Sequence, residues 1–260
     1  MKKLRKYGNG PFETAVIHGG PGAPGEMAPV AQELSLSDGI LEPLQKAKTI
    51  QGQIEELYEI VIKQGNPPMT LIGWSWGAWL SYLFVAQNPK SVKKLILVAS
   101  GPFEDKDAQN IMKTRLNRLS DEDRAKTLLL IDALEDPVMP DKNNILMRLG
   151  KLISIADSYD PMPHKSQSLD YRHDIYQSIW RQAIKLRSSG LLLEYGKKIQ
   201  CPVVAIHGDY DPHPAEGVKR PLDIILKDFR FLMLEKCGHT PWLERKARDR
   251  FYNLLRNELN

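Results

Sequence analysis

The chain has 260 residues, which suits one α/β domain, or one domain with a large insertion, and allows a sizeable buried core. Hydrophobic residues make up 42% and charged residues 26%, as in soluble globular proteins, and a net charge of +4 is too small to indicate a nucleic-acid partner. The sequence has no run of about 18 apolar residues and no apolar segment after its basic start, so we expect neither a membrane span nor a secretory signal. Its two cysteines do not make a disulfide framework, and we expect a reduced, cytoplasmic protein.

Strands and helices alternate over the first hundred residues. The apolar run Thr14–Ile17 predicts a strand, and Thr49–Lys63 predicts an amphipathic helix because its apolar residues recur at helical spacing. Lys94–Ala99 is a continuous apolar run, which is typical of a parallel strand buried on both faces. The other predicted elements are a helix at Pro29–Leu36, at most a short strand at Gly39–Glu42, a strand at Met69–Ile72 and a helix at Ala78–Ala86. The basic residues at the start are interpreted as a solvated arm: Lys2, Lys3, Arg5 and Lys6.

The alternation then stops, and the chain from about Phe103 to about Lys198 predicts helices only. A capping box begins at Ser120. The predicted helices are Ala125–Leu134, Asn143–Ile155 and Leu169–Leu186. An insertion of helices between two parallel strands, on the side where strands end, is a lid or cap. We therefore expect a core domain made of residues 1–101 and 199–260, and a helical cap domain at residues 102–198.

The strand pattern returns at Cys201–His207 and again at Phe229–Leu234. A helix at Gly217–Leu226 separates these strands, and a final helix runs to about Leu259. Strands joined by helices build a parallel sheet from βαβ units, so the predicted class is α/β with a mostly parallel sheet. Cys201 and Cys237 would lie at opposite ends of such strands, well over ~10 Å apart and too far to bridge.

The segment Gly73-Trp74-Ser75-Trp76-Gly77 matches G-x-S-x-G between a predicted strand and a predicted helix, which is the context of a nucleophile elbow. A sharp strand-to-helix turn leaves little room for neighbouring side chains. The two glycines provide that room, so the Ser75 hydroxyl can stand clear of the sheet. The backbone N–H of Trp76 would begin the helix, where negative charge is stabilised. The alternative is a glycine-rich helix entry with an incidental serine.

Three reactive residues each follow a predicted parallel strand: Ser75, Asp211 and His239. The carboxyl ends of parallel strands share one edge of the sheet, where sites form. A serine hydroxyl needs a base, a histidine can accept and return a proton, and a carboxylate fixes the imidazole tautomer. Ser, Asp, His is also the chain order of the α/β-hydrolases. His18-Gly19-Gly20 ends the first parallel strand, where its backbone N–H groups suit an oxyanion hole, although a plain Gly/Pro-rich turn has the same composition.

These residues resemble the α/β-hydrolase superfamily, and the resemblance covers nearly the whole chain. It rests on the elbow, on Gly208-Asp209-Tyr210-Asp211 and on Gly238-His239-Thr240-Pro241-Trp242. His18-Gly19-Gly20-Pro21-Gly22 resembles the version seen in the proline iminopeptidase-like serine hydrolases.

The resemblance implies an α/β-hydrolase fold with a helical cap, with Ser75 as nucleophile, Asp211 as acid and His239 as base. It also implies that the amides of Gly20 and Trp76 form the oxyanion hole. The family pattern G-x-x-D favours Asp211 over Asp209, which is better placed to satisfy backbone N–H groups of its own turn.

This sequence departs from the family in two places. Only about a dozen residues precede Thr14, so we expect reduced N-terminal strands. The cap does not align with the iminopeptidases, which resemble one another in holding a substrate's amino group with cap carboxylates. The candidates for that role are Asp157, Asp160, Asp170 and Asp174, and a solvated helix face is the simpler interpretation of each. Tyr176 and Trp180 share a helix face and are candidate substrate-binding residues, with core packing as the alternative.

The leading hypothesis is a serine hydrolase that cleaves a small ester or amide through an acyl-enzyme, with no cofactor and no metal. Its substrate would be a small molecule or short peptide, and neither nucleic acid nor a membrane is expected as a partner. The alternatives are a proline iminopeptidase-like aminopeptidase and a non-catalytic or very slow ligand receptor on a hydrolase scaffold. Haloalkane dehalogenases and epoxide hydrolases resemble this fold with aspartate in place of Ser75, which disfavours both. No G-x-G-x-x-G follows a strand, which disfavours an oxidoreductase.

Overall fold

A computed structural model describes residues 3–164 and 170–259. Over these residues the strands form a seven-stranded sheet with the order β1-β3-β2-β4-β5-β6-β7. β1 is antiparallel to β3, and every other neighbouring pair is parallel. The strands are β1 Leu4–Tyr7, β2 Phe12–Ile17, β3 Gly39–Pro43, β4 Met69–Trp74, β5 Val92–Val98, β6 Val203–Gly208 and β7 Phe229–Leu234. The predicted α/β class with a mostly parallel sheet is confirmed.

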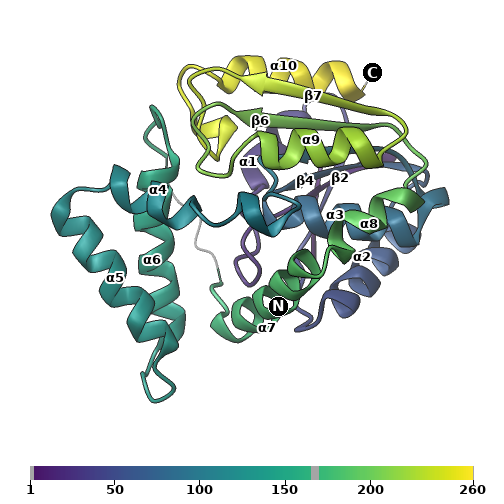
Figure 1. The fold of residues 1–260 in the computed structure, drawn as a ribbon. Coiled ribbons are helices and arrows are strands. Elements are labelled where there is room, and N and C mark those ends of the chain that lie inside the picture. The colour runs from purple at the N-terminus through teal and green to yellow at the C-terminus, as the bar shows by residue number, and fades with distance from the viewer. Residues whose placement is uncertain (1–2, 165–169, 260) are drawn as a thin grey trace.

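Helices cover both faces of the sheet (Figure 1). Successive strand residues point to opposite faces, so Leu71 and Leu95 enter one core while Ile72 and Ile96 enter the other. The first core is closed by α2 Ile50–Gln64, α3 Trp76–Gln87 and α9 Glu216–Ile225, and the second by α1 Ala28–Leu34 and α10 Arg248–Leu259. Burial on both faces explains why the central strands read as continuous apolar runs.

The chain between β5 and β6 is helical. Its helices are α4 Ile111–Arg118, α5 Asp121–Glu135, α6 Lys142–Asp157, α7 His173–Ser188 and α8 Leu191–Glu194. Figure 1 shows α4, α5 and α6 as an arm beyond the end of the sheet towards which the arrowheads of β6 and β7 point. α5 and α6 share a small apolar cluster, whereas α7 buries Ile175, Ile179 and Ala183 in the main core. Short 3₁₀ turns lie at Pro89–Ser91, Asp105–Asp107, Tyr195–Lys198 and Pro241–Leu243.

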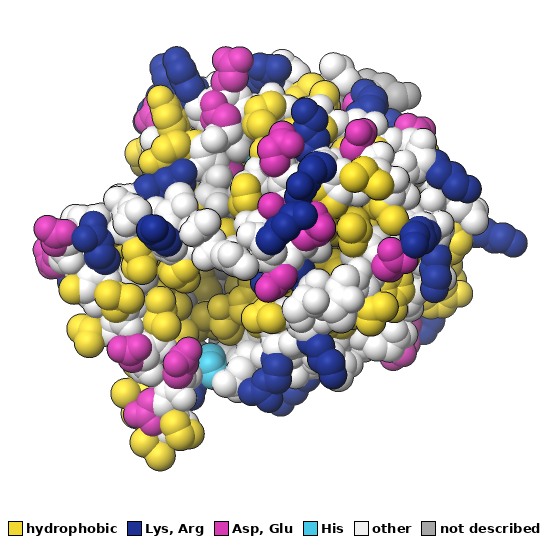
Figure 2. Space-filling view, in the orientation of Figure 1, with side chains coloured by type: hydrophobic (Ala, Val, Ile, Leu, Met, Phe, Trp, Pro, Cys, Tyr) yellow, Lys and Arg dark blue, Asp and Glu magenta, His cyan; other side chains and the backbone are white. Residues whose placement is uncertain are grey.

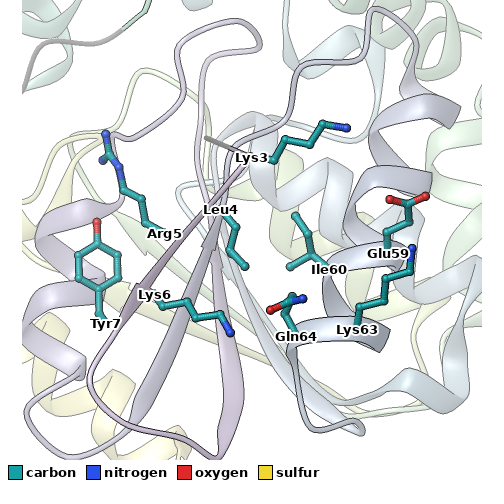
Figure 3. Close-up of a pocket in the computed structure, with 9 residues that line it drawn as sticks. All are labelled: Lys3, Leu4, Arg5, Lys6, Tyr7, Glu59, Ile60, Lys63 and Gln64. Carbon is teal, nitrogen blue, oxygen red and sulfur yellow. The ribbon is translucent and has the colours of Figure 1, made fainter. Parts of the chain in front are cut away.

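The interpretation of the basic start as a solvated arm is wrong for residues 4–7. They form β1, which pairs with β3, and Figure 3 shows the side chains of this strand alternating. Arg5 and Tyr7 donate hydrogen bonds to the buried Glu42, whereas Leu4 faces Ile60 of α2 across a surface groove of about 780 Å³ (Figure 3). A strand of four residues is too short to show a clear alternation in the sequence. It forms because a distant strand is available for pairing, and the local sequence does not show this.

Other boundaries differ slightly from the prediction. α3 begins at Trp76, directly after the elbow serine, and α7 begins at His173. Leu169, the predicted start of that helix, lies outside the described residues, as does Lys2. Both cysteines are free, as expected, and both are buried. No helix of the described residues is long and apolar enough to cross a membrane.

Candidate active site

Ser75 lies at the turn between β4 and α3 with φ 54° and ψ −116°. Such a conformation is rare for a residue with a side chain and persists only where the surroundings enforce it. A Cβ on Gly73 would collide with the backbone oxygen of Gly77, and a Cβ on Gly77 would collide with the backbone oxygen of Ile17. The two motif glycines are therefore required for the turn to pack against β2.

Ser75, His239 and Asp211 come together at the carboxyl edge of the sheet. Ser75 Oγ lies 3.0 Å from His239 Nε2, and His239 Nδ1 lies 2.8 Å from Asp211 Oδ2. Because a carboxylate only accepts, Nδ1 of His239 carries its proton and Nε2 is free to accept the proton of the serine hydroxyl. His239 and Asp211 are buried and Ser75 is half-buried. The three side chains form one hydrogen-bonded chain.

A second histidine shares the carboxylate of Asp211. His213 donates its backbone N–H (2.9 Å) and its Nδ1–H (2.8 Å) to Oδ1. Its ring packs against that of His239 with the centroids 4.6 Å apart. His207 in β6 donates from Nε2 to the backbone oxygen of His213 (2.8 Å), and that nitrogen lies 3.7 Å from Asp211 Oδ2. The two carboxylate oxygens therefore serve different histidines.

Burial and charge oppose each other in this cluster. Burial raises the pKa of Asp211, but the three surrounding imidazoles outweigh it and hold the pKa well below its usual range. Burial lowers the pKa of His239, but the adjacent Asp211 carboxylate more than offsets this, so the pKa is raised above 6.5. For His213 burial prevails and lowers the pKa to about 4 despite Asp211. His213 is consequently neutral at pH 7.

Asp209 has a different task. Its Oδ1 accepts the backbone N–H of Cys237 at 3.1 Å, which ties the loop after β6 to the loop after β7. The expected partner was an N–H group of its own turn, and the actual partner lies in the neighbouring loop. Among the described residues, the carboxylate that bonds to His239 is that of Asp211.

The loop after β2 packs directly on the elbow. A Cβ on Gly19 would lie 3.2 Å from Ser75 Cβ, and Gly20 has φ +24°, a value that favours glycine. Trp76 is the first residue of α3, so its N–H has no acceptor within the helix. Neither Gly20 nor Trp76 donates its backbone N–H to another backbone oxygen in the loops of residues 3–164 and 170–259.

Helices α4 and α6 hold the loops that carry Asp211 and His239. Arg115 of α4 donates two hydrogen bonds to the carboxylate of Asp157 (2.8 and 2.7 Å), and the backbone oxygen of Asp157 accepts the N–H of His239 at 2.8 Å. Arg118 donates to the backbone oxygen of Tyr210 (2.8 Å), and its guanidinium lies 3.7 Å from the centroid of the Tyr210 ring. The helical insertion thus supports both loops.

Glu244 fixes the same junction from the core side. Its buried carboxylate accepts the N–H groups of Gly238 (3.0 Å), Tyr159 (2.8 Å) and Asp160 (2.8 Å). Gly238 precedes His239, and residues 159–160 follow α6. One side chain therefore joins the histidine loop to the end of the helical arm.

Tyr176 and Trp180 lie one turn apart on α7, with ring centroids 6.4 Å apart. The Trp180 ring also faces Trp76 (6.4 Å) and Trp79 (6.0 Å) and packs against the main core. Tyr176 packs against the cluster of α5 and α6. Figure 2 shows a hollow walled by hydrophobic side chains between the α5–α6 arm and the body of the protein.

The cap acids considered for a substrate amino group mostly have basic partners in the protein. Asp157 pairs with Arg115, Asp160 pairs with Arg245 at 3.5 Å, and Asp174 pairs with Lys48 and Arg172. Asp170 is exposed. These contacts favour structural roles for the first three.

The sequence showed no metal-ligand spacing, but the fold brings Asp211, His213 and His239 together with potential ligand atoms within 4.8 Å of one another. Hydrogen bonds from both histidines to Asp211 account for this arrangement.

Residues 17–253 match the model of the Alpha/beta hydrolase family. The chain belongs to this family. A relative within curated proteins is the pimeloyl-[acyl-carrier protein] methyl ester esterase of Nitrosomonas europaea, which is 23% identical over 201 residues, 73% of this chain and 71% of that protein. The crystal structure of VinJ superposes with a TM-score of 0.67 at 18% identity, over 98% of this chain and 93% of that one. A thermophilic esterase from Thermogutta terrifontis gives a TM-score of 0.65 at 15% identity, over 98% and 92%. The predicted α/β-hydrolase fold is confirmed.

Several residues around this candidate site were not identified from the sequence. His213 is only two positions from Asp211, so its proximity was available in the sequence. Arg115 is far from Ser75 and His239 along the chain, and Glu244 is near His239 but belongs to no motif. Only their tertiary contacts show that they act on this site. Glu26, in the glycine-rich loop after β2, was also not identified from the sequence.

Proposed function

We propose that the protein is a serine hydrolase that cleaves a small ester or amide. The observation that carries the proposal is the hydrogen-bonded chain from Ser75 through His239 to Asp211. Family membership supports the hydrolase class, and the esterases among its relatives favour an ester over a peptide.

In the proposed reaction, His239 Nε2 takes the proton of the Ser75 hydroxyl as Oγ attacks the carbonyl carbon. The resulting oxyanion accepts hydrogen bonds from the N–H groups of Gly20 and Trp76. The imidazolium, stabilised by Asp211, then protonates the leaving group, whose bond to carbon breaks and leaves the acyl group on Ser75. Water attacks this ester with His239 again as base, which releases the acid and restores the serine.

The helical insertion, residues 102–198, is proposed as a cap that bounds the substrate site. The apolar hollow beside the arm supports this role (Figure 2). Tyr176 and Trp180 are proposed candidates for its wall, although the contacts of Trp180 with Trp76 and Trp79 favour packing over substrate binding.

A fluorophosphonate probe tests the nucleophile directly. The wild-type protein should be labelled at Ser75 and should hydrolyse p-nitrophenyl acetate or butyrate, and Ser75→Ala should abolish both label and turnover. Ser189→Ala changes a serine at the far end of α7 and is the matched control, which should retain both. Stoichiometric labelling of Ser75→Ala would refute the assignment.

The alternatives differ in measurable ways. A proline iminopeptidase-like enzyme would hydrolyse proline-β-naphthylamide faster than simple esters. A ligand receptor on the same scaffold would acquire the label slowly and show no sustained turnover. The resemblance of the His18–Gly22 loop is what supports the aminopeptidase, whereas the esterase relatives support the ester.

A further inference from the structure

The loop after β2 holds a carboxyl group with one buried oxygen that lacks a hydrogen-bond partner. Glu26 lies near the end of this loop, two residues before α1, and its Oε2 is closed to solvent and has no hydrogen bond to any described residue. A buried polar group without a partner costs free energy, and native structures contain few of them. Such a group calls for an explanation, and a bound ligand is one.

The position of this carboxyl is specific. A Cβ on Gly20 would lie 3.7 Å from Glu26 Oε2, so the carboxyl packs on the backbone of the residue proposed to bind the oxyanion. In its ionised form the carboxyl would also interact with the charges of His239 and of Tyr171, which precedes α7. Glu26 therefore lies where the oxyanion loop, the base and the helical insertion approach one another.

The carboxyl is protonated at neutral pH. Burial raises the pKa of Glu26 to about 8, against the opposing effect of His239. A protonated carboxyl can donate one hydrogen bond and still accept others. It also adds no negative charge beside an oxyanion, which a carboxylate would.

We propose that Glu26 binds a hydrogen-bond donor, a hydroxyl or an amino group, on the α-carbon of the substrate's acyl group. The inference rests on the proposed function, because it assumes that the amide of Gly20 binds the scissile carbonyl. The α-carbon is bonded to the carbonyl carbon, so its substituent is the part of the acyl group nearest to a side chain packed on Gly20. Oε2 itself is closed to solvent, but the Glu26 side chain as a whole is only half-buried, so the carboxyl would turn its unpaired oxygen towards the bound substrate, which would supply the missing partner.

Three isosteric esters test this inference. Methyl lactate, methyl alaninate and methyl isobutyrate carry a hydroxyl, an amino and a methyl group at the same position. Since the esters differ in intrinsic reactivity, the measured quantity is kcat/KM of each variant relative to wild type. Glu26→Leu should lower kcat/KM about ten-fold more for the lactate, the alaninate or both than for the isobutyrate, as expected for one lost hydrogen bond. Glu33→Leu is the control, because Glu33 of α1 pairs with Arg256 of α10. It should change kcat/KM by the same factor for all three esters.

The pattern of losses identifies the donor. A selective loss on the lactate assigns a hydroxyl, and one on the alaninate assigns an amino group. Equal losses on all three esters in Glu26→Leu would mean that Glu26 is structural and would overturn the inference. Glu26→Met is the second variant, because methionine is unbranched and apolar. The melting temperature and the rate at which the probe labels Ser75 show whether each variant is folded. Wild-type protein that hydrolyses no ester and resists the probe would refute the proposed function, and the inference with it, whereas normal turnover without selectivity would refute the inference alone.

Discussion

His213 donates two hydrogen bonds to one oxygen of Asp211 and leaves the other oxygen to His239. Two donors from one residue fix the rotation of the carboxylate about its Cβ–Cγ bond. Oδ2 is thereby held towards Nδ1 of His239, the position that sets the tautomer of the proposed base. Because His213 is neutral, it fixes the carboxylate without adding a charge beside the imidazolium that would form during the proposed reaction.

Replacing His213 with leucine should lower kcat about ten-fold with little change in KM. The substitution removes the side-chain donor to Oδ1. Loss of one hydrogen bond to a charged group corresponds to roughly a ten-fold change in rate. His213→Asn is the matched variant, because its side-chain amide can place an N–H near the position of Nδ1. Steady-state kinetics on one activated ester should show most of the activity retained in His213→Asn, and equal losses in the two variants would contradict this role.

Asp211→Asn should fold but lose about 10⁴ in kcat at neutral pH, the loss known for the equivalent change in the trypsin triad. The amide cannot hold the imidazole in the required tautomer. Asp209→Asn should keep most of its activity and lose about 1 kcal/mol of unfolding free energy, because the acceptor of the Cys237 N–H is weakened. Kinetics and urea denaturation of both variants check this, and the reverse ranking of kcat would assign the role of the acid to Asp209.

The value of kcat/KM should fall at acidic pH and again at alkaline pH. His239 must be neutral to act as base, and its pKa is raised by Asp211, so kcat/KM should fall on acidification with a midpoint above pH 6.5. Glu26 ionises near pH 8 and then puts negative charge beside Gly20, so kcat/KM should also fall above about pH 8.

The variant Glu26→Gln separates these two limbs. It should abolish the alkaline fall and leave the acid limb in place. Among the described residues, the other titratable groups that interact with Glu26 are His239, which sets the acid limb, and Tyr171, whose pKa burial raises to about 12. An alkaline fall that persists unchanged in Glu26→Gln would assign it to another group.

Glu244→Ala should destabilise the protein by about 3 kcal/mol, because three backbone N–H groups lose a buried acceptor. The histidine loop should also loosen, with a fall in kcat. Glu235→Ala, an exposed glutamate shortly before the same loop, is the control and should change neither. Chemical denaturation and kinetics measure the two effects, and a stable Glu244→Ala with normal kcat would show that the junction does not need this carboxylate.

Trp180→Ala should lower the unfolding free energy by roughly 2–3 kcal/mol, since the ring packs on Trp76, Trp79 and the main core while remaining partly exposed. Substrate preference over a series of acyl chain lengths should stay the same. Altered preference with an unchanged melting temperature would instead assign Trp180 to the substrate wall.

The sequence by itself determined the parallel sheet, the elbow and the strand ends at which Ser75, Asp211 and His239 lie. These features have local causes. Burial on both faces makes a strand continuously apolar, a tight turn requires glycine, and the end of a strand is marked by the residues that follow it. The preference for Asp211 over Asp209 rested on the family pattern G-x-x-D, and the hydrogen bond to His239 agrees with it.

Only the tertiary structure decided which groups surround these residues. β1 exists because β3 offers a partner, and Glu42 is buried there because Arg5 and Tyr7 reach it. Arg115 acts on the histidine loop through Asp157, and Glu26 Oε2 is buried without a hydrogen-bond partner. Hydrogen bonding and desolvation depend on neighbours that are distant along the chain. Local periodicity and motif spacing therefore do not predict these interactions.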